Sequence, residues 1–81
     1  MDAPTQYGAL LDQVRSRRRL PVPRERRRIR EDAGLSLRAV AAAIGVSHTA
    51  VASWEAGGVP REHTAAYARF LEELREVLGS P

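Results

Sequence analysis

The stretch GLSLRAVAAAIGVSHTAVASWEAG, Gly34 to Gly57, contains the signals of two short helices joined by a tight turn. Ser36 is a residue type that favours a helix N-cap, and the apolar residues after it repeat at helical spacing. Gly45 ends this helix, and Ser47 caps the next one after a linker of only Gly45 and Val46. Gly57 ends the second helix, so the stretch is predicted to fold as helix, turn, helix.

The second helix of this pair has two unlike sides. At 100° per residue, one side carries Ser47, Ala50, Val51 and Trp54. The opposite side carries small or polar residues only, namely His48, Thr49, Ala52, Ser53 and Ala56. A helix that only filled a core would not leave such an outer face. In a helix-turn-helix, the second helix enters a DNA major groove, and we expect the small outer face to lie there.

Two further helices are predicted before this pair. The first covers about 5–19, with Thr5 as its N-cap, and the prolines of the segment 20–23 end it. The second runs from about Arg24 to Ala33 and is closed by the following glycine. The apolar residues that predict the first helix by their spacing are Tyr7, Leu10, Leu11 and Val14.

A last helix is predicted over about 60–78, with Pro60 at its first position. Its apolar residues at spacings of three and four are Tyr67, Phe70, Leu71, Leu74, Val77 and Leu78. No stretch alternates at period two between turn signals, so we predict an all-α chain. We divide it into an N-terminal helix with an arginine-rich, proline-containing connector (1–23) and a helix-turn-helix domain (24–81), forming one compact unit.

The basic residues are concentrated in one part of the sequence. All 13 cations are arginines, and nine of them lie between Arg15 and Arg30, where Glu25 is the only acid. That window therefore carries about +8, while the net charge of the whole chain is +3. Such a block attracts polyanions, and the arginine fork suits phosphate in particular. The alternative is a solvated helix surface that is rich in arginine because the genome favours arginine codons. Such a codon bias alone would not gather the charges into one block.

Composition narrows the function classes further. The 81 residues suit one small domain, and the absence of cysteine excludes disulfides and thiolate metal sites. The two histidines lack further ligands at matching spacing, so we expect no metal and no cofactor. We also expect no enzyme, because no nucleophile, paired carboxylate or glycine-rich phosphate loop is evident. Without a signal-peptide pattern or a bilayer-length apolar run, we expect a cytoplasmic, nucleoid-associated protein and no membrane partner.

The residues Gly34 to Gly57 resemble the helix-turn-helix of the Xre family, the Cro-like and lambda-repressor-like proteins of phages and bacteria. The matching positions are the Gly-Leu-Ser opening, Val40 with Ala41, the Gly-Val-Ser turn, Val51, and the Trp-Glu-x-Gly ending. With the preceding helix included, the resemblance covers roughly 24–78. It implies a four-helix bundle, here with an extra N-terminal helix, that binds double-stranded DNA in transcription regulation, commonly as a repressor.

Carried over by position, the resemblance implies base contacts from His48, Thr49, Ala52 and Ser53. It implies an ion pair between Arg30 and Glu55 that joins two helices of the bundle. Phosphate contacts are expected from Ser47, Arg38, Arg24, Arg26, Arg27 and Arg28, and minor-groove or backbone contacts from Arg17, Arg18 and Arg19. The core is expected to contain Ile29, Leu35, Val40, Ala41, Ile44, Val46, Val51 and Trp54.

Two positions depart from the family pattern. Leu37 stands where family members often carry a DNA-contacting glutamine, so one expected anchor is missing. Arg26 stands at a position that is usually apolar in the family, so this arginine either disturbs the packing of its helix or adds a phosphate contact.

Two questions stay open at the level of sequence. The same fold suits a protein-interaction adaptor or antitoxin subunit whose arginine block docks on an acidic partner. The apolar N-terminal helix packs either on Phe70, Leu74 and Leu78 of its own chain or across the two-fold axis of a homodimer formed by the N- and C-terminal helices.

Overall fold

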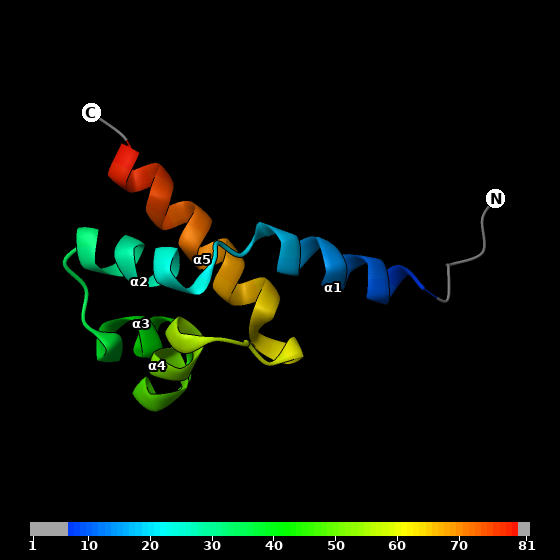
Figure 1. Cartoon of the computed structure of the whole chain (residues 1–81), viewed down its shortest axis with the longest axis horizontal. Coiled ribbons are helices and arrows are strands. Elements are labelled where there is room, and N and C mark those ends of the chain that lie inside the picture. The colour runs from blue at the N-terminus through cyan, green and yellow to red at the C-terminus, as the bar shows by residue number, and fades with distance from the viewer. Residues whose placement is uncertain (1–6, 80–81) are drawn as a thin grey trace.

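The computed structural model describes residues 7–79, and its regular elements there are five helices without a strand. Helices α3 (Leu37–Ile44) and α4 (His48–Ala56) lie side by side against α2 (Pro23–Asp32) and α5 (Arg61–Gly79) (Figure 1). Helix α1 (Gly8–Arg19) extends away from this bundle like an arm, and the C-terminal half of α5 stands out on the other side. The predicted all-α class is confirmed.

The helix ends follow the predicted signals with small shifts. Helix α2 starts with Pro23 in its first turn, where the missing N–H of proline is harmless. Pro60 precedes α5 instead of opening it, and its carbonyl accepts hydrogen bonds from the His63 amide and the Thr64 hydroxyl, both at 3.0 Å. The predicted cap Thr5 lies outside the described residues.

The turn between α3 and α4 has the expected cap chemistry on both sides. The Ser36 hydroxyl accepts a hydrogen bond from the Ala39 amide at 3.0 Å, and the Ser47 hydroxyl accepts one from the Ala50 amide at 3.2 Å. Gly45 ends α3 with φ at 88°, a left-handed conformation that a side chain would strain. These local signals end α3 and begin α4 within a turn of three residues.

The core lies where α2, α3 and α5 meet the inner side of α4. Trp54 is its centre, and its ring lies 4.9 Å from that of Tyr67, measured between centroids. Leu35, Ile44 and Val46 are partly buried and pack against the core from its edges. The buried cluster itself contains Ile29, Val40, Ala41, Val51, Trp54, Tyr67 and Leu71.

Helix α1 packs on α5 with a different side from the one its apolar spacing suggests. Ser16 is buried and Leu20 is partly buried against the core, so the C-terminal half of α1 makes the contact. Phe70 and Leu74 pack against the core of the bundle, and Leu78 is exposed. Helix α1 therefore packs on α5 of its own chain, but the residues of its apolar stripe remain 42–58% exposed: Tyr7, Leu10, Leu11 and Val14.

Within residues 7–79, no helix is long and apolar enough to cross a bilayer. The same part of the chain contains no cluster of three or more acidic or histidine side chains that could hold a metal ion.

Candidate nucleic-acid interface

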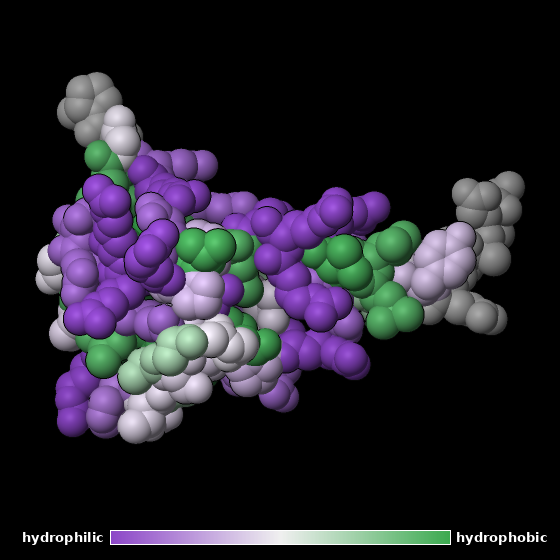
Figure 2. All heavy atoms as spheres, viewed as in Figure 1, coloured by the Kyte–Doolittle hydropathy of each residue, from purple (hydrophilic) through white to green (hydrophobic). Residues whose placement is uncertain are grey.

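The two sides of α4 differ in the structure as they do in the sequence. Val51 and Trp54 are 0% and 2% exposed, so they hold the inner side of the helix in the core. The outer side presents small or polar side chains, and the surface over α4 is largely pale, between hydrophilic and hydrophobic (Figure 2). Its exposed residues are His48, Thr49, Ala52, Ser53 and Ala56.

The start of α4 brings several predicted contact residues together. Arg38 of α3 lines a surface hollow together with Ser47 and His48, so a cation lies beside the helix N-terminus. The Ser47 and Thr49 hydroxyl oxygens are hydrogen-bonded to each other at 3.2 Å. The positive end of the helix dipole, two hydroxyls and an arginine at one place form an arrangement that suits a phosphate group.

A buried ion pair fixes α4 to α2. Arg30 donates two hydrogen bonds to Glu55, from Nε to Oε2 at 2.6 Å and from Nη2 to Oε1 at 2.9 Å. Its remaining nitrogen, Nη1, donates to the Leu35 carbonyl at 3.0 Å. The hydrogen bonds that Arg30 donates to Glu55 raise the pKa of Arg30, although burial acts in the opposite direction. The pair therefore positions the outer face of α4 relative to α2 and is not available for DNA.

Arg26 does not take the predicted phosphate contact. Its side chain is buried, and its guanidinium group donates to three backbone carbonyls, Pro21 O at 2.7 Å, Trp54 O at 2.8 Å and Gly57 O at 2.7 Å. Burial without a carboxylate partner lowers the pKa of Arg26. The arginine therefore ties the connector before α2 to the carbonyl end of α4, where a cation also suits the helix dipole.

His63 is half-buried against Trp54. The centroids of the two rings lie 5.3 Å apart, with the planes tilted by 36°. The imidazole thus covers one side of the central tryptophan.

The arginine block of the sequence does not form one free basic patch. Arg30 forms its ion pair with Glu55 at the edge of the core, and four more of the nine arginines form ion pairs with acids on the surface. The surface pairs are Arg15 with Asp12, Arg19 with Glu72, Arg27 with Glu31 and Arg28 with Asp32. These four pairs are exposed, so phosphate can compete for them at low cost.

Three arginines of the block have no such partner among residues 7–79, namely Arg17, Arg18 and Arg24. Outside the block, Arg38 and Arg61 are equally without one in the described part of the chain. Arg27 lines a hollow together with Ala52 and Ala56, so α2 places one paired arginine beside the outer face of α4. Arg24 and Arg28 do not line it.

Arg61 was missed by the reasoning from sequence, although its position contains a signal. It is the first residue of α5, where the helix dipole disfavours a cation. A basic residue at that position therefore indicates a role other than stabilising its own helix.

Comparison with known proteins agrees with this geometry. Searches of curated proteins and of solved structures gave no significant match. A family model described as helix-turn-helix, of the Cro/C1 type, matches residues 27–79, which include α3, the turn and α4. The chain therefore belongs to the helix-turn-helix family of DNA-binding proteins.

Proposed function

We propose that the protein is a sequence-directed transcriptional regulator of bacterial or phage origin that binds double-stranded DNA with α4 in the major groove. The observation that supports this best is the outer face of α4, which is exposed, free of large side chains and held firmly by the Arg30–Glu55 pair. His48, Thr49 and Ser53 face the base edges, and the Ala52 methyl contacts a thymine methyl.

Affinity and base selection come from different residues in this proposal. The outer face of α4 lacks an arginine, glutamine or asparagine, the side chains that make bidentate base contacts. Its discrimination is therefore modest, and phosphate contacts supply most of the affinity. If each of the five unpaired arginines binds one phosphate, the slope of log affinity against log salt is about −4.5.

Selection from a random duplex library tests the proposal directly. We expect an enriched sequence whose affinity falls steeply with salt; failure of the intact chain to bind any duplex at low salt would contradict it. Thr49→Glu places a negative charge in the groove and should abolish binding, while the acid in the first turn of α4 suits the helix dipole and preserves the fold. Ala66→Glu, which adds the same charge on the exposed side of α5, serves as the control.

The protein binds as a homodimer in this proposal, with the α1 arm as the contact. Tyr7 and Leu10 are 58% and 54% exposed, and hydrophobic side chains form a continuous surface on the outer half of α1 (Figure 2). The exposed end of α5, with Val77 and Leu78, offers a second copy a complementary apolar surface. A two-fold arrangement would present two α4 helices to half-sites about one DNA turn apart.

The oligomeric state is tested by light scattering of the free protein and of its complex with the selected duplex. The double variant Leu10→Glu with Leu11→Glu should be monomeric. Val22→Glu changes another exposed apolar side chain, outside α1, and should leave the dimer intact. A wild-type monomer, both free and on a two-fold-symmetric duplex, would contradict the dimer and leave the DNA-binding proposal standing.

A further inference from the structure

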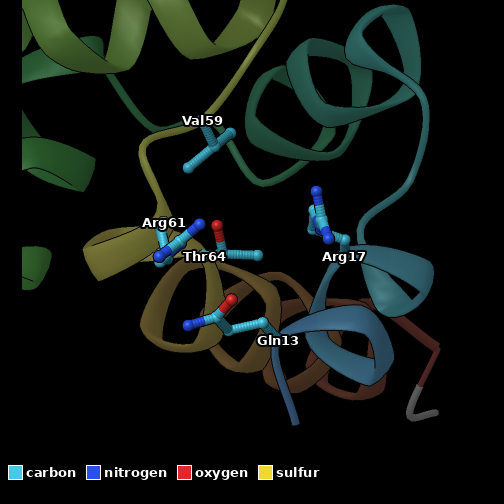
Figure 3. A pocket seen from close by; sticks show the side chains of 5 residues that line it. All are labelled: Gln13, Arg17, Val59, Arg61 and Thr64. Atoms are coloured by element: carbon cyan, nitrogen blue, oxygen red, sulfur yellow. The ribbon is translucent and has the colours of Figure 1, made fainter. Parts of the chain in front are cut away.

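A small cavity lies where α1 meets the start of α5. Its lining comes from three segments: Gln13 and Arg17 of α1, Val59 before α5, and Arg61 and Thr64 of α5. Figure 3 shows these side chains arranged around one space, with the polar groups of Gln13, Arg61 and Thr64 on one side and Arg17 on the other. The volume is about 220 Å³.

The cavity is positively charged and contains no compensating acid. None of its lining residues is Asp or Glu, and neither Arg17 nor Arg61 has an ion pair or side-chain hydrogen bond within residues 7–79. Arg61 is also the first residue of α5, so the positive end of the helix dipole adds to the field. Two guanidinium groups that share a cavity repel each other, and a bound anion would relieve this repulsion.

The donors and the size of the cavity indicate the class of anion. Two arginine forks and the Gln13 amide supply hydrogen-bond donors, whereas the Thr64 hydroxyl proton is already donated to the Pro60 carbonyl. Pockets for drug-sized ligands are larger, about 300–1,000 Å³. The cavity therefore suits one compact oxyanion that accepts several hydrogen bonds, and arginine forks are well suited to phosphate.

We infer that Gln13, Arg17 and Arg61 form a phosphate-binding clamp, and that its ligand is a phosphodiester of the DNA backbone. The choice of DNA as the source of the phosphate rests on the proposed function. It is supported by the position of the cavity, because Val59 and Arg61 belong to the segment that leads directly from the end of α4. Gln13 and Arg17 precede the residues 27–79 that match the family model, so the N-terminal arm completes the clamp.

The variants Arg17→Gln and Arg61→Gln, singly and together, test the clamp. Both side chains are exposed and without ion-pair partners, so unchanged thermal unfolding is expected and checks the fold. Arg69→Gln removes the same charge from the exposed side of α5, away from the cavity, and is the matched control. One measurement follows inorganic phosphate binding by NMR, at the Gln13 side-chain amide and the arginine Nε–H groups. The other follows binding of the library-selected duplex over a range of salt concentrations.

We expect each single variant to lose about tenfold in duplex affinity at 0.1 M salt and to reduce the salt slope by about 0.9, relative to Arg69→Gln. If the cavity variants lose duplex affinity and Arg69→Gln does not, the ligand of the clamp is a DNA phosphate, whether or not the cavity also responds to inorganic phosphate. Shifts on phosphate addition in the wild type but not in the double variant, with unchanged duplex binding, support the clamp and assign it to a free phosphate ligand.

Two results would overturn the clamp. One is wild-type duplex affinity and slope in the double variant together with no response of the cavity resonances to phosphate. The other is an Arg69→Gln variant that loses as much affinity as the cavity variants, since the effect would then follow net charge alone. If the wild type binds no duplex, the proposed function fails and the phosphate titration still decides the cavity.

Discussion

Helix α2 has arginines on its inner and outer sides, and the two sides use the same residue type for opposite purposes. Inside, Arg26 and Arg30 are buried or nearly so, and their nitrogens donate to carbonyls and to Glu55. Outside, Arg24 has no partner among residues 7–79, and Arg27 and Arg28 make exposed pairs. We expect the two inner arginines to determine the stability of the fold and the three outer arginines to determine salt-dependent binding to DNA.

The largest effect is expected from breaking the inner ion pair. Glu55→Ala leaves the largely buried Arg30 charge without its carboxylate, which should cost about 3 kcal/mol, the low end of the range for buried pairs. Denaturant unfolding measures the loss. Glu31→Ala breaks the exposed pair with Arg27 and should cost less than about 1 kcal/mol. Equal losses in both variants would show that the inner and outer arginines do not differ in this way.

Tyr67 lies beside the inner arginines, and its burial predicts a dependence of stability on pH. Burial, with help from Glu55, raises the pKa of Tyr67 to about 12, although Arg26 and Arg30 act to lower it. The unfolded side chain loses its proton near pH 10. The contribution of neutral Tyr67 is therefore fully present below pH 10 and is lost as the pH rises to about 12, by roughly 2–3 kcal/mol.

Unfolding measured between pH 9 and pH 12 checks this window. Tyr67→Phe removes the titrating group, so its stability should change much less over the same range. A wild-type curve that is flat up to pH 12 would contradict the raised pKa.

Arg26→Met isolates the other inner arginine. The methionine fills similar space but leaves the Pro21, Trp54 and Gly57 carbonyls without their donor, at a cost of about 2 kcal/mol. Arg24→Met, two residues away and on the outer side, should stay within about 0.5 kcal/mol of the wild type. If Arg26→Met unfolds at the wild-type denaturant concentration, the three hydrogen bonds contribute little.

Substitutions on the outer side of α2 should change DNA binding and hardly change stability. Arg24→Gln removes one unpaired cation, so the salt slope for the selected duplex should become shallower by about 0.9 if this residue contacts a phosphate. Titration at several salt concentrations provides the slope. An unchanged slope would remove Arg24 from the contact surface and leave the other exposed arginines to supply the affinity.

The bundle was predictable because its signals are local. Ser36, Gly45 and Ser47 act within three or four residues of their own position, and the family model confirms the helix-turn-helix they predict. The buried side of α4 was equally predictable, since Val51 and Trp54 repeat at helical spacing.

The errors concern contacts between distant segments. Arg26 bonds to backbone carbonyls, which have no signature in the sequence, and its polarity alone suggested a phosphate contact. The apolar spacing of α1 did not indicate the side that packs on α5, because that side contains Ser16, a small polar residue. In the basic block, the pair of Arg30 with Glu55 is the one that the resemblance implies, whereas Glu72, which neutralises Arg19, lies 53 residues away and has no signal near it in the sequence.

The outer face of α4 has a consequence for how such a protein can evolve. Ala52, Ser53 and Ala56 are exposed and make no side-chain hydrogen bond within residues 7–79, so the fold does not depend on their identity. In the proposed binding mode, mutations there change the preferred DNA sequence without first having to be compensated in the core. A lineage carrying this scaffold can therefore acquire new target sites in single steps, while the inner arginines keep the helix in place.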